Sequence, residues 1–494
     1  MQKIKQLMQL FQVSGKELAE VLFVDQSLVS KWCSGKRRLK AGSAYLQDIT
    51  AYFLKLDAPN GYIRLRQLLP GGARESQDLL AERLETWLVG DNMSEQDGEI
   101  QLLDLCDLAK LCSICSFQDN QGRRDAISYF EEYAATCDGP LEAITYNTEN
   151  ATWFYEDKEF SRKSRRDNLR FVNRGGKLTL IHPLNTTYKN LAYSILNWMP
   201  LYLSGGDVRG YYIPKYAEDT ILYTYFVIKD RLALMGMSTK KSKKMLTLML
   251  TEKQIVNRIE EILQELIRQA SPLMRYISWR DPELHTSFTG LSLHWKGHGR
   301  PEPPRLLYAA QLPLLLPSGK WRKMLQTCGL SEKELQGALE DFRMLEQFWQ
   351  GRETHVLLNV QCLRTYLSAE TVRLDLLCGL TGREIRVPAK QYSLLLNGAL
   401  EAILSNEEMK IGLANPLCGD PELAYSILAQ RNTGVLFWGG KATERMALVE
   451  EIKTVTAVYE YLEESWNAIP ELQKSKEYVA GALRALADEA QQGV

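Results

Sequence analysis

Histidines and cysteines occur at two places with spacings that could bind a metal. His294 and His298 are four residues apart, as zinc ligands on a helix would be, but Gly297 and the glycine and proline that follow argue against a helix. The second place holds four cysteines: Cys106, Cys112, Cys115 and Cys137. They lie in a leucine-rich helical pattern, which favours buried structural thiols over a zinc site. We therefore expect neither a metal nor a cofactor.

Phosphate-binding and nucleophilic motifs are also incomplete. The segment GVLFWGGKA at 434–442 lacks the spacing of a phosphate-binding loop, and Ala442 stands where such a loop has a hydroxyl for magnesium. The five histidines form no specific Ser-His-Asp or Cys-His set with other residues. We therefore expect that the chain is not an enzyme.

Charge is distributed unevenly along the chain. Residues 1–40 hold six lysines and two arginines against three acidic residues, so this segment carries +5 while the whole chain carries −1. A basic segment on an acidic body favours a polyanionic partner for that segment, because non-specific affinity for nucleic acid comes mostly from phosphate neutralisation.

The basic segment lies in a region, residues 1–68, that we predict to be helical and call the head. Ser14 stands three residues before Glu17, the spacing of a capping box, and Asp25 and Gly35 are start and stop signals for the next helix. The two helices would share a small core of Leu18, Ala19, Leu22, Val24, Val29 and Trp32. Two helices with a short connection are what a helix-turn-helix needs to place its second helix in a major groove.

The segment SGKELAEVLFVDQSLVSKWCSGKRRLK resembles the Cro/lambda-repressor (XRE) helix-turn-helix family. The resemblance implies a five-helix domain that binds double-stranded DNA. Two positions depart from the family: Phe23 replaces the usual glycine of the turn, and Gly15 replaces a phosphate-contacting glutamine. The alternative is a helical domain used for protein contacts.

The resemblance also implies which side chains contact DNA. Base contacts fall on Gln26, Ser27 and Lys31, and the chemistry agrees, because Gln pairs with adenine, Lys with guanine and Ser with either. Phosphate contacts are expected from Ser14, Ser30, Lys36, Arg37, Arg38 and Lys40.

Beyond the head we expect a helical connector and then an α/β body. Helices are predicted over 99–115, 246–270 and 421–430, and strands alternate with helices from residue 141 onward. A parallel between 178–235 and 410–438 suggests two related α/β halves. The predicted domains are 1–68 (helix-turn-helix), 69–140 (helical connector), 141–245 (α/β), 246–390 (mixed helical) and 391–494 (second α/β unit with C-terminal helices).

The order of elements in the body weakly resembles one half of a phospholipase D-like unit, most visibly in YFVIKDRLALMGMS. The catalytic His, Lys and Asp of that fold align with Leu222, Thr224 and Lys229, so the resemblance implies a catalytically degenerate unit. The predicted fold class is thus multidomain, mainly α with α/β.

Two features of the body could bind a ligand. The segment 161–177 holds seven basic residues and is either a second nucleic-acid or phosphate contact or a solvated helix face. A cluster of aromatic residues could line a pocket or belong to the core: Trp198, Tyr202, Tyr211, Tyr212 and Tyr216. The two together suggest an anionic or aromatic ligand.

Segments such as GRRDAISYF, NWMPLYLSG and YYIPKY also resemble an uncharacterised group of bacterial XRE-type regulators with a long C-terminal region. With 45% apolar and 24% charged residues, no secretory signal and no long uncharged apolar stretch, we expect a cytoplasmic protein that does not meet a membrane. We expect a homodimeric transcription regulator whose body senses a small molecule or docks a protein. The alternatives are an enzyme of unknown reaction joined to a DNA-binding head, and an interaction scaffold.

Overall fold

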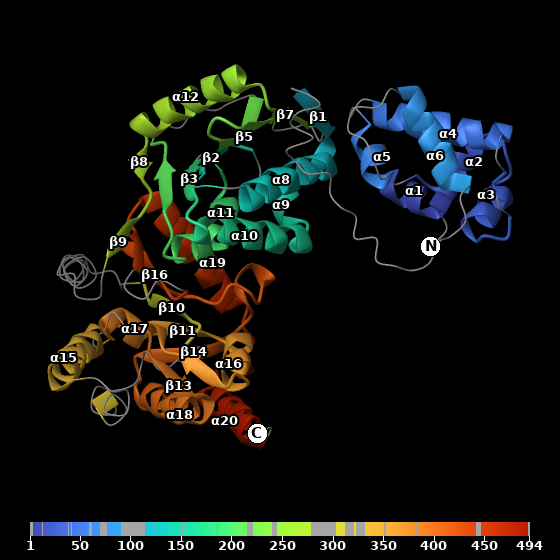
Figure 1. Cartoon of the computed structure of the whole chain (residues 1–494). Helices are drawn as coiled ribbons and strands as arrows, with labels where there is room; N and C mark the ends of the chain where they lie inside the picture. Colours follow the sequence, from blue (N-terminus) through green and yellow to red (C-terminus); the bar gives the residue numbers. More distant parts are fainter. Residues whose placement is uncertain are drawn as a thin grey trace. The chain divides into compact units, whose positions relative to one another are not determined.

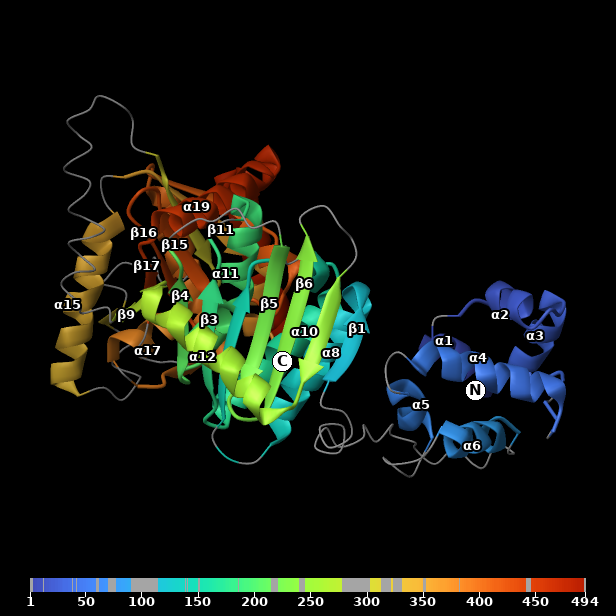
Figure 2. The same cartoon turned by 90° about the horizontal axis from the view of Figure 1, so that it is seen from above.

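The computed structural model describes most of the chain, and Figures 1 and 2 show its elements in two views. The described residues are 3–11, 13–37, 39–40, 42–58, 62–69, 77–89, 114–137, 139, 141–149, 152–184, 186–214, 221–239, 245–277, 303–311, 321–322, 331–349, 352–381, 383–440 and 446–492. They form two compact units, residues 1–133 with 230–259, and residues 134–229 with 260–494. The fold is multidomain, mainly α with α/β, as predicted.

The head has the five helices that the sequence predicts, and a sixth helix shares its core. The six are α1 (Lys3–Phe11), α2 (Gly15–Val21), α3 (Gln26–Cys33), α4 (Ala44–Asp57), α5 (Ile63–Leu68) and α6 (Gln77–Val89). Leu80, Leu84 and Leu88 of α6 are buried in the same apolar cluster as Leu7 and Phe53. Residues 77–89, which we predicted as connector, therefore pack as part of the head.

Outside the head, the described part of the first unit contains three strands and most of one helix, together with the first turns of α12 (Lys253–Gln269). The strands and the first helix are β1 (Ile114–Gln118), α8 (Asp119–Thr136, whose last turn enters the second unit), β6 (Leu232–Thr239) and β7 (Leu246–Leu250). β7 pairs antiparallel with both β1 and β6. Two predictions are wrong here, because residues 114–115 and 246–250 are strand rather than helix. The predicted helix over 99–113 lies outside the described residues.

The second unit contains the same four-stranded motif twice. The strands are β2 (Glu142–Asn147), β3 (Lys177–His182), β4 (Val208–Tyr212) and β5 (Ile221–Ile228), then β10 (Arg305–Ala309), β11 (Thr354–Asn359), β14 (Met409–Ala414) and β15 (Ser426–Gln430). In the first set β2 pairs parallel with β3 and antiparallel with β5, and β3 pairs parallel with β4. In the second set β10 has the same relation to β11 and β15, and β11 to β14. The second unit therefore has two α/β halves with the same strand order, but β3 corresponds to β11, so the predicted parallel between 178–235 and 410–438 had the wrong register.

Smaller strands extend both sets. They are β8 (Ser271–Pro272), β9 (Arg275–Ile277), β16 (Gly434–Trp438), β17 (Met446–Val449) and the separate pair β12 (Thr371–Arg373) and β13 (Arg386–Pro388). β15, β16, β17 and β9 pair antiparallel in that order. The predicted helix over 421–430 is wrong, because residues 426–430 are β15 and are buried at every position. A short apolar run of this kind carries no period that separates a buried strand from a helix.

Helices surround these strands. They are α9 (Thr152–Tyr155), α10 (Lys158–Asn173), α11 (Tyr188–Tyr202), α12 (Lys253–Gln269), α15 (Glu332–Trp349), α16 (Val360–Leu367), α17 (Asp375–Thr381), α18 (Ala389–Ser405), α19 (Ile452–Asn467), α20 (Lys476–Gln492) and two 3-10 turns, η3 (Leu417–Gly419) and η4 (Glu471–Lys474). Within the ranges given above, no helix combines the length and apolar character that a bilayer span needs.

Candidate nucleic-acid interface

Helices α2 and α3 each begin at a side chain that caps their backbone. The amide of Glu17 donates to Ser14 Oγ at 3.1 Å, and the amide of Ser27 donates to Asp25 Oδ1 at 2.8 Å. Hydrogen bonds from the side chain and backbone of Ser27 hold the pKa of Asp25 below its usual value. Both caps were predicted from the sequence, and they fix where each helix starts.

One face of α3 is buried and the opposite face is exposed. Val29 and Trp32 are buried in the head core, with the Trp32 ring 5.6 Å from the ring of Tyr45. The four predicted DNA-contacting residues of the helix are on the exposed face: Gln26, Ser27, Ser30 and Lys31. Helical spacing places these four in one row, because positions three and four apart are neighbours on the surface. The head therefore presents amide, hydroxyl and ammonium groups together.

The turn between the two helices has an unusual residue at its tip. Phe23 has φ of 51° and is 96% exposed. Its amide donates to the Glu20 carbonyl, and the next amide, of Val24, donates to the Ala19 carbonyl. The turn therefore closes in the left-handed conformation that glycine would adopt more easily, with a phenylalanine that buries almost nothing.

The basic segment after α3 is exposed as well. Gly35 has φ of 72° and ends the helix, and the amide of Arg37 donates to the Lys31 carbonyl at 3.1 Å. Lys36, Arg37 and Lys40 are exposed to solvent, while Arg38 lies outside the described residues. The predicted phosphate contact Ser14 is exposed too, although its oxygen already accepts the Glu17 amide.

The basic segment of the body has a different character from that of the head. Arg165 on α10 is 5% exposed and pairs with Asp420 and with Glu422, the latter at 3.3 Å. Arg162 pairs with Asp420 at 3.1 Å. Burial by itself raises the pKa of Asp420, but hydrogen bonds from Arg165 and the Glu422 amide outweigh it and lower the pKa.

Three more basic residues of α10 are also paired with acidic groups. Lys163 and Arg170 contact Asp167 at 3.0 and 3.1 Å, and Arg166 contacts Glu422 at 3.3 Å. The segment 161–177 thus has a largely exposed basic face, as one of the two alternatives expected, and it also ties α10 to the loop before β15. Sequence reasoning missed this because the acidic partners lie about 250 residues further along the chain.

The predicted aromatic pocket is divided among different surroundings. Tyr202 is buried in the core, where its hydroxyl lies 2.7 Å from His182 Nε2. Trp198 and Tyr211 line two different cavities. Tyr212 is half-buried on β4 opposite Ser271, and Tyr216 lies outside the described residues. The described members of the set therefore do not form one ligand pocket.

The cavity next to Trp198 lies at the carboxyl ends of β2 and β3, where open α/β sheets commonly bind ligands. Its volume is about 60 Å³. Its walls combine aromatic rings with polar groups: Trp153, Phe154, Trp198, Phe226, Thr145, Asn147, Glu149, His182, Asn190 and Ser194. We call it the strand-end cavity.

Two of its buried polar groups are ionisable. Burial lowers the pKa of His182 to about 4, so the ring is neutral at physiological pH. Glu149 is also buried and accepts a hydrogen bond from the Thr224 hydroxyl. A carboxylate and a neutral imidazole do not favour an anionic ligand. The sequence signal for this cavity was present but unused, because Asn147 and His182 are the last residues of parallel strands.

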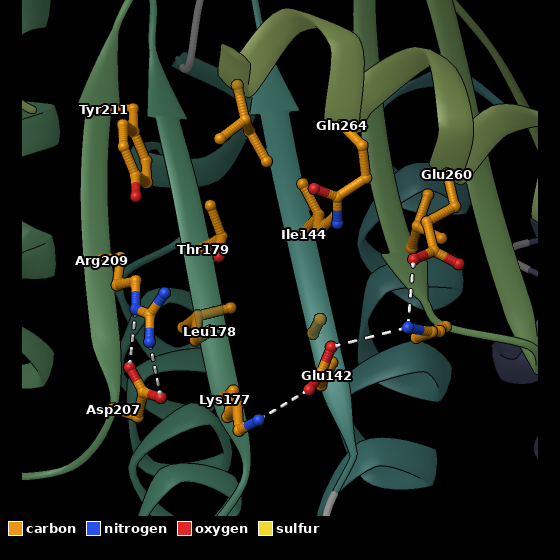
Figure 3. A pocket seen from close by; sticks show the side chains of 14 residues that line it. Glu142, Ile144, Lys177, Leu178, Thr179, Asp207, Arg209, Tyr211, Glu260 and Gln264 are labelled. Atoms are coloured by element: carbon orange, nitrogen blue, oxygen red, sulfur yellow. Dashed lines mark hydrogen bonds and ion pairs between the residues drawn. The ribbon is translucent and has the colours of Figure 1, made fainter. Parts of the chain in front are cut away.

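A second cavity, of about 170 Å³, lies between α12 and the strands β2, β3 and β4 (Figure 3). Charged side chains of both signs line it. Lys177 Nζ donates to Glu142 Oε1 at 2.7 Å, and Arg209 Nε donates to Asp207 Oδ1 at 3.0 Å. Lys229 Nζ lies 3.9 Å from Glu260 Oε1. Because these charges pair with one another, we do not consider this cavity a candidate ligand site.

The positions of the phospholipase D-like motif carry other chemistry. Leu222 is buried, Thr224 donates to Asn147 at 2.9 Å, and Lys229 pairs with acidic groups of the second cavity. Of the metal candidates, Cys115 is buried in β1, Cys137 is half-buried, and the others lie outside the described residues. Among the residues that the model places, no three His, Cys, Asp or Glu side chains gather as a metal site.

Comparisons with known proteins give little. No family model matches the chain, and no curated protein matches it. Among solved structures, the chain is similar to TrmBL2, described as an archaeal chromatin protein with a novel mode of DNA binding. The two are 9% identical, with a TM-score of 0.24 over 54% of this chain and 92% of the other. A likeness of this size carries no argument about function.

Proposed function

We propose that the chain is a cytoplasmic transcription regulator that binds a specific sequence of double-stranded DNA through its head. The observation that carries the proposal is the exposed row of Gln26, Ser27, Ser30 and Lys31 on α3. Side chains of these types read base edges in a major groove, and a capped helix with its other face buried holds them in a fixed register. The excess charge of +5 in residues 1–40 supplies the phosphate affinity.

The test separates base contacts from phosphate contacts. The full chain selects its preferred duplex from a random library, and binding is then measured across salt concentrations. Lys31→Ala should lose about 1–3 kcal/mol on the selected site and relax the preference at one base pair. Arg37→Ala should weaken all duplexes about equally and lower the salt slope by about one. Lys55→Ala, on the exposed surface of α4, is the matched control.

Three results would contradict the proposal. No enriched sequence would refute sequence-specific binding altogether. Equal losses on specific and non-specific DNA for Lys31→Ala would refute its role as a base reader. A loss for Lys55→Ala as large as for Arg37→Ala would show that any surface cation serves.

A homodimer is part of the proposal, because a single small domain reads a short half-site with modest affinity. Two heads related by a two-fold axis would place their α3 helices about 34 Å apart, one turn of DNA. A duplex with two half-sites at that spacing should bind more tightly than one with the spacing altered by half a turn. Equal affinity for both spacings would contradict the dimer on DNA.

The body is proposed to sense a ligand, and the strand-end cavity is its site. The buried Glu149 carboxylate, the neutral His182 and the aromatic walls favour a small cationic or neutral ligand with apolar surface. This replaces the anionic ligand inferred from the sequence, since the basic residues of α10 are already paired. We propose no catalytic role for the body. Leu222, Thr224 and Lys229 at the phospholipase D-like positions support this, because they replace the catalytic His, Lys and Asp.

Filling the cavity tests this sensing role. Thr186 lines the cavity at its half-exposed rim, so Thr186→Trp should block it while leaving the core intact, and Thr186→Ser should leave it open. With a promoter reporter, Thr186→Trp should keep basal control and lose the response, a coupling of about 1–3 kcal/mol. A full response in Thr186→Trp cells would place the sensor elsewhere.

A further inference from the structure

Helix α12 has two apolar surfaces, and the fold uses one of them. Val256 and Leu263 are fully buried, which fixes the face that the helix turns inward. Beside it runs a second stripe made of Ile255, Ile259, Ile262 and Leu266. Ile255 is 39% exposed and Ile262 is 56% exposed, and the other two are half-buried.

The stripe has the spacing of a helix-pairing seam. Its members follow one another at intervals of four, three and four residues, which keeps them in one line along the helix. Single exposed apolar residues are normal on a protein surface, but a continuous line of β-branched and leucine side chains marks a contact surface. The stripe is about eleven residues long, enough for four contact layers with another helix.

The second repeat shows how an equivalent helix uses such a surface. Helix α19 follows the antiparallel pair β16 and β17, just as α12 follows β6 and β7. α19 packs against β15 and β16, and it also packs extensively against α11. α19 is therefore covered by strands of its own repeat and by a helix of the first repeat, whereas Ile255 and Ile262 of α12 are exposed.

Charges beside the stripe select the occupant. Arg258 and Glu265 are exposed and seven residues apart, in one row along its outer edge, and Glu265 also pairs with Arg268 of its own helix. When two copies of α12 run antiparallel, Ile255 meets Leu266 of the second copy and Ile259 meets its Ile262. Arg258 then lies across from Glu265 of the second copy, and the two-fold axis repeats that pair. A parallel arrangement does not bring these two charges together.

We propose that α12 pairs antiparallel with α12 of a second copy of this chain through the stripe Ile255, Ile259, Ile262 and Leu266. Such a contact is isologous and closes as a dimer, because each copy offers the same self-complementary surface. This inference rests on the proposed function, which calls for a dimer that presents two heads to one DNA duplex. The α12 contact would form that dimer.

The test measures the mass of the full chain by light scattering and sedimentation, without DNA. We expect a dimer, and Ile262→Glu should weaken it about 100-fold or more, since two buried carboxylates would lose water without a partner. Ile452→Glu is the matched control, because Ile452 at the start of α19 is also 56% exposed. It should leave the dimer unchanged.

Charge reversal tests the antiparallel register. Arg258→Glu and Glu265→Arg should each weaken the dimer, and the double variant should restore it, because the reversed charges again face each other. A monomeric wild type, an Ile262→Glu variant that dimerises like Ile452→Glu, or a double variant weaker than both single variants would each overturn the proposal. If the full-length Ile262→Glu variant is monomeric and still binds a specific DNA sequence, the proposed DNA-binding function stands. The dimer contact through α12 is judged separately, from the mass of the wild type.

Discussion

Replacing Phe23 with glycine should stabilise the head. The side chain is 96% exposed, so its removal forfeits almost no buried apolar surface. Its backbone has φ of 51°, a conformation that L-residues adopt at a cost of about 1–2 kcal/mol and glycine adopts freely. Glycine also makes the unfolded chain more flexible, which offsets about 0.5–1 kcal/mol of the gain. The net stabilisation is about 1 kcal/mol.

Hydrogen exchange of the full chain measures this gain without cutting the protein. The slowest amides of α4 report opening of the whole head, because Ile49 and Phe53 of that helix are fully buried. A stabilisation of about 1 kcal/mol slows their exchange about fivefold. Amides of β10 and β11, in the other compact unit, should exchange at unchanged rates.

Phe23→Ala is the control that makes the argument refutable. Alanine removes the aromatic ring but keeps the Cβ atom that strains the left-handed conformation. Exchange in Phe23→Ala should therefore stay close to wild type. If alanine slows exchange as much as glycine does, or if glycine accelerates it, backbone strain at this turn does not limit the stability of the head.

Two further predictions concern the body. Burial lowers the pKa of His182 from its ordinary 6.5 to about 4, so its stabilising effect is complete above pH 6.5 and declines as the pH falls toward 4. Wild type should lose about 2 kcal/mol more than His182→Gln between pH 7 and pH 5, and equal losses in urea unfolding would contradict this. Asp420→Asn should lower the unfolding free energy by about 3 kcal/mol, since it takes a partner from the buried Arg165. Glu142→Gln, which breaks an exposed pair, should cost much less, and a similar loss for both would be the contrary result.

Local signals made the head predictable. Ser14, Asp25 and Gly35 act through backbone atoms within three residues of themselves, so their effect is visible in a short stretch of sequence. The unfavourable placement of Phe23 was visible for the same reason. It occupies the one position of the turn that requires a positive φ, where the family usually has glycine. What could not be read locally was the inclusion of α6 in the head core, which depends on packing across the domain.

Strands of the body were harder to predict where both of their faces are buried. Residues 426–430 are buried at every position, and 246–250 precede an amphipathic helix without a break that the sequence marks. Period-based reasoning needs one polar face, and these strands have none or are too short to show it. Where burial does alternate, as over most of β5, a period of two distinguishes a strand from a helix.

The candidate sites depended on long-range pairing in the same way. Charge in the segment 161–177 was counted correctly, but the pairing of Arg165 and Arg166 with Asp420 and Glu422 could not be read from the sequence. In the head the same residue types are exposed, and their contact with DNA stays a prediction. The difference is the surrounding charge, which composition alone does not place.

The two repeats differ most at the carboxyl ends of their parallel strands. In the second repeat these ends are filled: the hydroxyl of Tyr308 accepts from the Leu417 amide at 3.2 Å, and Asn359 accepts from the first amides of α16. In the first repeat the corresponding ends, at Asn147 and His182, line the strand-end cavity. A duplicated fold thus has one copy whose polar groups complete the core and one whose polar groups face a cavity. This difference supports the proposal that the first repeat, rather than the second, binds a ligand.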